Sequence, residues 1–185
     1  MKRPMMPTAV VLLVLALVGT AGFAQAKSLA VSANKTVVDG VVKPGEYTFT
    51  QESENITLYA NRTADTLSLA VVGATSGWVA VGLGSLKMNG STIFMGFVGT
   101  DGKVQFKAQA GTGHRHTEAA AGVTASIISS MIKEAGGKTT LEITLKPGDY
   151  IKAGQSALEV IFAVGEDKSF VPYHTSRGSL SIKLS

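Results

Sequence analysis

Beyond its first 26 residues the chain has few side chains able to bind a metal or a cofactor. It contains no cysteine, so it can neither attach haem through a C-x-x-C-H motif nor hold an iron–sulfur cluster by thiolates. Imidazole and thioether groups remain, and both are neutral ligands that also serve as ordinary packing groups. There are three of each in this part of the chain: His114, His116 and His174, and Met88, Met95 and Met131.

Met88 and His174 stand in contexts that single them out. Met88 lies in the polar segment 85–91 (SLKMNGS), between two very apolar runs at 78–83 and 92–98. A methionine there should meet something apolar, and one interpretation is that it plugs the open end of the domain. His174 closes the sequence FVPYH before the last apolar run. Its imidazole fits a metal ligand, a pH-sensitive group or an ordinary loop residue.

The segment HRHTE offers a second cluster. If this segment is extended, His114, His116 and Glu118 line one face at alternate positions. These residue types suit zinc or copper, but metal ligands normally converge from separate elements. A polar loop at the rim of the domain is the other interpretation, and the sequence leaves both open.

Short runs rich in β-branched and aromatic residues, separated by turn signals, make up most of the chain. Two brief runs at 29–31 and 36–38 come first. The pattern predicts an all-β fold, an antiparallel immunoglobulin-like β-sandwich of about nine to ten strands in one continuous domain. The segment 123–134 fits a short helix as well as a strand. The predicted strands are 47–50, 55–60, 66–72, 78–83, 92–98, 104–108, 123–128, 139–146, 157–164 and 179–184.

Residues 1–26 are typical of a secretory signal peptide. Lys2 and Arg3 precede the apolar run 9–18, and Ala-Gln-Ala at 24–26 provides a small-x-small cleavage site. An uncleaved membrane anchor is the alternative, although the apolar run is too short to span a bilayer comfortably. We therefore expect export to the periplasm or the extracellular space.

The mature domain, residues 27–185, has little net charge. Loss of Lys2 and Arg3 lowers the formal net charge from +4 to +2. No window combines clustered basic residues with interleaved aromatic residues, which argues against a nucleic-acid partner. The sequence also lacks a G-x-S-x-G motif, a cysteine nucleophile and an assignable carboxylate pair. We therefore expect a protein that is not an enzyme.

Six short motifs occur along the chain: Asp-Gly-Val at 39–41, Pro-Gly-Glu-Tyr at 44–47, Gly-Trp-Val-Ala-Val-Gly at 77–82, Met-Asn-Gly-Ser at 88–91, Tyr-His at 173–174 and Arg-Gly at 177–178. Their order is similar to that of the DOMON domain, an exported β-sandwich module present alone and beside cytochrome b561-type membrane domains or dehydrogenases. The chain resembles this family from about residue 34 to 184.

The resemblance implies a cofactor, a function and a partner. In haem-carrying DOMON domains the corresponding methionine and histidine are the axial ligands of a non-covalent haem b, which predicts Met88 and His174 as iron ligands here. Such a closed six-coordinate site transfers single electrons, so a periplasmic or membrane-associated redox partner is expected. A haem-free module that binds a sugar or another small ligand is the alternative. The aromatic residues expected to line the cofactor are Trp78, Phe94, Phe97 and Tyr173.

Overall fold

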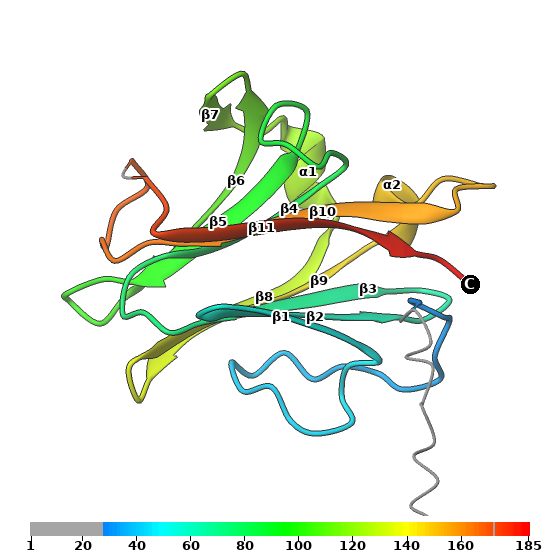
Figure 1. Cartoon of the computed structure of the whole chain (residues 1–185), viewed down its shortest axis with the longest axis horizontal. Coiled ribbons are helices and arrows are strands. Elements are labelled where there is room, and N and C mark those ends of the chain that lie inside the picture. Colours follow the sequence, from blue (N-terminus) through cyan, green and yellow to red (C-terminus); the bar gives the residue numbers. More distant parts are fainter. Residues whose placement is uncertain (1–27, 172) are drawn as a thin grey trace, which may run out of the picture.

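Two antiparallel β-sheets face each other in the computed structural model, which describes residues 28–171 and 173–185 (Figure 1). Eleven strands and two very short helices make up this described part. The predicted β-sandwich is confirmed. The predicted signal peptide, residues 1–26, lies outside the described residues. Within the described ranges, neither helix has the length and apolar character that a membrane crossing needs.

The first sheet has five strands in the order β1-β2-β3-β9-β8. Each strand pairs antiparallel with its neighbour, and β3 at the centre joins a hairpin partner, β2, to the later strand β9. The bounds are β1 Phe49–Ser53, β2 Ile56–Arg62, β3 Leu67–Gly73, β8 Ile127–Ala135 and β9 Lys138–Leu145.

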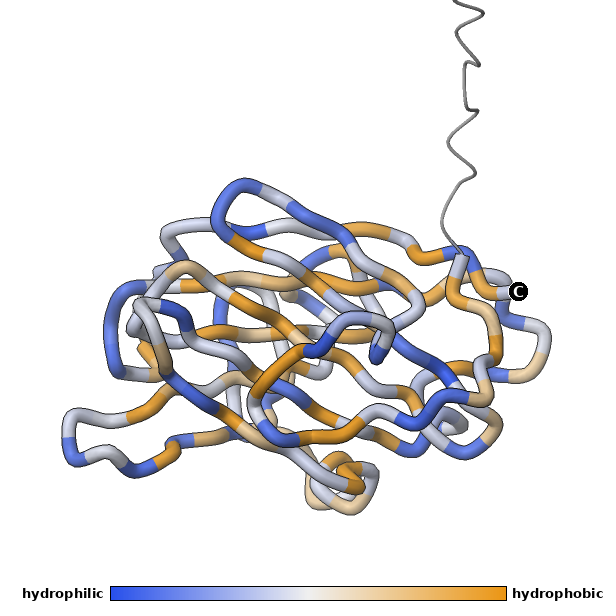
Figure 2. Tube along the Cα trace, turned by 90° about the horizontal axis from the view of Figure 1, so that it is seen from below, coloured by the Kyte–Doolittle hydropathy of each residue, from blue (hydrophilic) through white to orange (hydrophobic). Residues whose placement is uncertain are grey.

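The second sheet has six strands in the order β11-β10-β4-β5-β6-β7. Hydrophobic residues run along the strands of both sheets, and hydrophilic residues gather in many of the loops around them (Figure 2). The bounds are β4 Val79–Leu83, β5 Thr92–Val98, β6 Val104–Thr112, β7 Arg115–Glu118, β10 Ala157–Val164 and β11 Ser176–Lys183, with the helices α1 Ala121–Ala125 and α2 Pro147–Tyr150.

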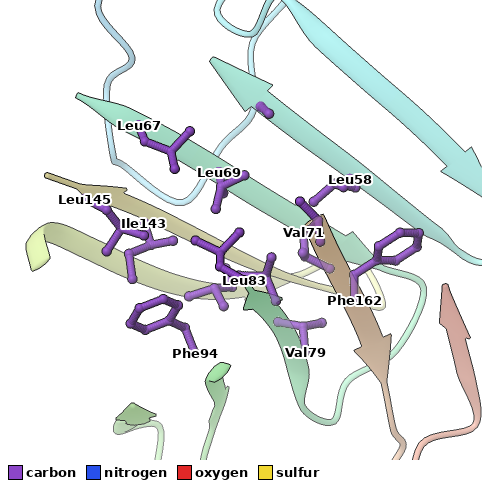
Figure 3. Packing of buried hydrophobic residues seen from close by; sticks show 14 of the residues in the cluster. Leu58, Leu67, Leu69, Val71, Val79, Leu83, Phe94, Ile143, Leu145 and Phe162 are labelled. Carbon is purple, nitrogen blue, oxygen red and sulfur yellow. The ribbon is translucent and has the colours of Figure 1, made fainter. Parts of the chain in front are cut away.

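The main core lies between the two sheets, where alternate residues of most strands point inward (Figure 3). Burial of each large apolar side chain stabilises the fold by about 1.5–3 kcal/mol before conformational entropy is counted. The labelled members of this core are Leu58, Leu67, Leu69, Val71, Val79, Leu83, Phe94, Ile143, Leu145 and Phe162.

The region 121–135 differs from the predicted strand at 123–128. A short helix, α1, ends at Ala125, and the strand β8 begins only at Ile127. The turn at Gly136 and Gly137 explains the shift, because both glycines have a positive φ, of 60° and 72°. Such a two-residue turn forms a tight hairpin, which places β8 immediately before it. The strand β7 and the helix α2 were not predicted.

A buried carboxylate on the outer face of the five-stranded sheet binds the segment that precedes β1. Glu142 is fully buried and accepts hydrogen bonds from the backbone N–H groups of Asp39 (3.0 Å) and Gly40 (2.6 Å) and from the Tyr47 hydroxyl (2.7 Å). These bonds tie the segment before β1 to the sheet, and Figure 1 shows this segment running along that side. Burial, together with the nearby Glu142 carboxylate, raises the pKa of Tyr47 above its usual value of 10.

Candidate functional site

A second apolar cluster covers the outer face of the six-stranded sheet, away from the main core. A sheet face turned away from the core is usually polar, so an apolar and covered outer face needs a reason. We call this set the outer cluster. Its buried members are Trp78, Ala80, Ile93, Met95 and Phe97, and Met88, Ala163 and Phe170 pack against them.

The loop that carries Met88 has a fixed shape. The Ser91 N–H donates to the Met88 carbonyl at 3.1 Å, which closes a β-turn, and Gly90 in this turn has a φ of 84°. That conformation suits glycine at the third position of a turn. The buried Ser91 hydroxyl also donates to the Lys87 carbonyl at 2.6 Å. The motif Met-Asn-Gly-Ser therefore makes a defined turn beside the sheet.

Gly111 of β6 gives this loop its place on the outer face. A Cβ at Gly111 would lie 1.7 Å from the Met88 carbonyl oxygen and 3.2 Å from the Met88 Cγ. Two backbone hydrogen bonds secure the contact, from Gly90 N–H to the Gly111 carbonyl (3.0 Å) and from Gly111 N–H to the Ser91 carbonyl (2.9 Å). Only glycine allows the Met88 loop to approach β6 so closely.

The loop between β10 and β11 covers the other end of the outer cluster. The Phe170 ring packs on Phe97, with ring centroids 4.9 Å apart, and the Lys107 ammonium lies 4.8 Å from the Phe170 centroid. The indole of Trp78 lies against Gly165, where an added Cβ would be 2.3 Å from the indole nitrogen. This loop therefore packs directly on Trp78 and Phe97.

His174 belongs to this same loop. It is half-buried, and its Nε2 lies 3.2 Å from Nη1 of Arg177. The adjacent Thr175 N–H donates to the carbonyl of Val164 at 2.8 Å, which fixes the loop at the end of β10. Arg177 pairs across the strands with Ala163, which packs on the outer cluster. Paired residues of antiparallel strands project to the same face, so His174 contacts a side chain of the outer face.

Met88 and His174 reach this face from opposite ends of β4. The Met88 loop follows Leu83 at one end of the strand, whereas the loop of His174 adjoins Val164, which pairs with Val79 at the other end. The structure thus associates both predicted ligands with one face without placing them side by side.

The four predicted lining residues lie in different environments. Trp78 is buried in the outer cluster, as is Phe97 beside it. Phe94 points into the main core instead, where it stacks against Phe106, and Figure 3 shows it among the inward-facing side chains. Tyr173 is 93% exposed. Trp78 and Phe97 are therefore the predicted lining residues that the structure places in the same cluster as Met88.

Three buried polar atoms lack a hydrogen-bond partner among the described residues: Trp78 Nε1, Gln109 Oε1 and His116 Nδ1. All three belong to the outer face. Gln109 pairs with Ile93 of the outer cluster, and His116 pairs with Gly111 beneath the Met88 loop. Buried polar groups normally have a partner, so Gln109 and His116 have hydrogen-bonding capacity left for a water molecule or another group, whereas Trp78 Nε1 lies against Gly165. Sequence analysis missed Gln109, because nothing marks a glutamine in a strand as buried.

The zinc or copper alternative finds no support in this arrangement. His116 and Glu118 lie in β7, but His114 precedes the strand in the turn. Among the described residues, no group of three or more His, Asp or Glu side chains is arranged to hold a metal ion. An open cavity of about 320 Å³ lies at the edge of β6, and Gln109, Glu118 and Ile127 are among its lining residues.

Comparison with known proteins identifies related folds. No family model matches the sequence. No curated protein matches it. The cytochrome b domain of pyranose dehydrogenase from Coprinopsis cinerea superimposes with a TM-score of 0.55 at 12% identity, covering 74% of this chain and 81% of that chain. The cytochrome domain of Myriococcum thermophilum cellobiose dehydrogenase gives 0.51 at 13% identity over the same shares.

A second group of similar structures binds sugars. A family 9 carbohydrate-binding module from Caldicellulosiruptor kristjanssonii in complex with glucose gives a TM-score of 0.53 at 11% identity, covering 86% of this chain and 96% of that chain. At such identities the likeness shows a common β-sandwich fold and nothing finer. This fold is shared by cytochrome b domains and by carbohydrate-binding modules.

Proposed function

We propose that this chain is an exported DOMON-like domain that binds haem b on the outer face of its six-stranded sheet and serves as a single-electron carrier rather than an enzyme. Met88 and His174 are the residues that would bind its iron. The observation that carries the proposal is the outer face itself, which combines an apolar cluster with three unpartnered buried polar atoms. The shared fold with cytochrome b domains supports it.

The chemistry of the side chains fits this group. A thioether and a neutral imidazole are ligands that suit haem iron, and Met88 and His174 would hold it from loops at opposite ends of β4. When bound, such a haem takes up and releases one electron at a time. Ala80 and Ala163 have small side chains on this face, and Trp78 and Phe97 are buried near them, so a group bound here would be shielded from water. An apolar surround of this kind raises the reduction potential.

The main test is a hemin titration of the mature protein and four variants, followed by redox titration. His174→Ala should abolish tight haem binding. Met88→Ala should retain haem with an altered spectrum and a lower potential, because a thioether ligand raises the potential. Met131→Ala and His114→Ala are the matched controls, since Met131 is 40% exposed on the other sheet and His114 is exposed in a turn. Unchanged spectra in both ligand variants would overturn the assignment.

A sugar-binding module is the second candidate, and one observation favours it. Tyr173 is 93% exposed in the loop of His174, and exposed aromatic rings offer large apolar surfaces for ligands. In that case the protein would be colourless and would not bind added hemin, whereas gluco-oligosaccharides would change its tyrosine and tryptophan fluorescence. Tyr173→Ala should then remove the sugar response. A coloured protein with no response to sugars would exclude this candidate.

A further inference from the structure

On the outer face, a row of directly paired residues crosses five strands and has a cationic side chain at each end. The strand pairings align Arg177 with Ala163, Ala163 with Ala80, Ala80 with Met95, and Met95 with Lys107. Directly paired residues of antiparallel strands share a face. Since neighbouring strands lie about 4.8 Å apart, the backbone positions of Arg177 and Lys107 are about 19 Å apart, and the three residues between them are small or apolar.

Arg177 at one end of this row contacts His174. Its Nη1 lies 3.2 Å from the His174 Nε2. A guanidinium group can only donate hydrogen bonds, so the His174 Nε2 must accept, which leaves the proton of the neutral ring on Nδ1. The guanidinium therefore occupies the lone pair through which this imidazole would bind a metal.

Among the described residues, Arg177 also has no anionic partner, because none of the ion pairs found there includes it. Iron binding at the His174 Nε2 would displace the Arg177 N–H from that lone pair. The released guanidinium would remain within reach of the same ligand, and a planar guanidinium binds carboxylates through two parallel hydrogen bonds.

From this geometry we infer that Arg177 recognises a carboxylate of the ligand that His174 binds, and that it holds the His174 Nε2 until that ligand arrives. The inference rests on the proposed function and deepens it, since it specifies an iron porphyrin with free carboxylate groups. Arg177 is thus a binding residue for the carboxylate and a positioning residue for the imidazole.

The test compares hemin with hemin dimethyl ester, whose carboxylates are blocked. A charge-assisted hydrogen bond contributes enough to make hemin bind the wild-type protein about tenfold or more tightly than the ester. Arg177→Gln should remove most of this preference, and Arg177→Lys should retain part of it. Lys183→Gln is the matched control, because Lys183 projects from the same face of the same strand about 20 Å away and should keep the full preference.

A second measurement needs no haem. Long-range ¹H–¹⁵N NMR spectra of the haem-free protein report which nitrogen of His174 carries the proton. The wild-type protein and Lys183→Gln should show the Nδ1–H form, and Arg177→Gln should lose this preference. Far-UV circular dichroism and the unfolding midpoint confirm that each variant is folded.

Each outcome decides a different point. If Arg177→Gln weakens hemin and its ester equally, or leaves the preference unchanged, the inference is overturned and the proposed function stands. If the wild-type protein binds neither porphyrin, the proposed function fails and the inference fails with it. Loss of the preference in Arg177→Gln alone, with the change of tautomer, supports both.

Discussion

Substitution of Gly111 by alanine should displace the Met88 loop from the sheet. The added Cβ would lie 1.7 Å from the Met88 carbonyl oxygen, whereas Cβ atoms in proteins essentially never come within 3.0 Å of another heavy atom. The obstacle is backbone, so the loop must move by more than 1 Å. That movement breaks the two hydrogen bonds between the loop and Gly111, at 3.0 and 2.9 Å. Two lost bonds at about 1 kcal/mol each and overpacking of about 1–3 kcal/mol predict a loss of about 3–5 kcal/mol.

Urea unfolding followed by tryptophan fluorescence measures this loss, and hemin titration measures its effect on the site. Gly111→Ala should unfold at lower urea and bind hemin with an altered spectrum. Gly122→Ala is the matched control, since nothing lies within 4 Å of an added Cβ there, and a helical position favours alanine. If Gly111→Ala stays within about 0.5 kcal/mol of the wild-type protein and binds hemin with the same spectrum, the described packing of the Met88 loop is wrong.

Three further predictions concern parts of the fold around the site. In the wild-type protein Tyr47 should make the free energy of unfolding fall above pH 10, because the unfolded state then loses the phenol proton while the folded state keeps it, at about 1.4 kcal/mol per pH unit until the folded pKa is reached. Tyr47→Phe should reduce this fall, which urea unfolding from pH 9 to 11.5 measures. Glu142→Leu leaves three donors without their acceptor and should lower the free energy of unfolding by about 3 kcal/mol or more, measured by urea unfolding at pH 7. Phe170→Ala should uncover Phe97 and lower the same quantity by about 1–2 kcal/mol, with increased binding of a hydrophobic dye.

Sequence patterns predicted the strands that pack on both sides. Val79–Leu83 and Thr92–Val98 form β4 and β5 close to the expected bounds, because uninterrupted apolar runs suit strands buried on two faces. Patterns failed where tertiary contacts decide the structure. The apolar positions of the segment 123–128 fit both the helical and the strand period. The turn at Gly136 and Gly137 determines the position of the strand β8, which precedes it.

The candidate site was only partly predictable. Met88 stood out because a methionine is unusual in a polar loop, and Gly90, which the turn after Met88 requires, is visible in the sequence. The role of Gly111 was not, because its close approach to Met88 depends on strand pairing distant in sequence. Phe94 and Phe97 lie three positions apart in β5 and therefore point to opposite faces of the sheet, and the sequence did not indicate which of them faces outward.

The central claim is tested most directly by the absorption spectrum of the mature protein, purified after export from a haem-sufficient host and recorded oxidised and then reduced with dithionite. The account predicts a sharp Soret band and a narrow α band on reduction, the signature of a low-spin, six-coordinate haem. A colourless protein that also fails to bind added hemin would contradict it.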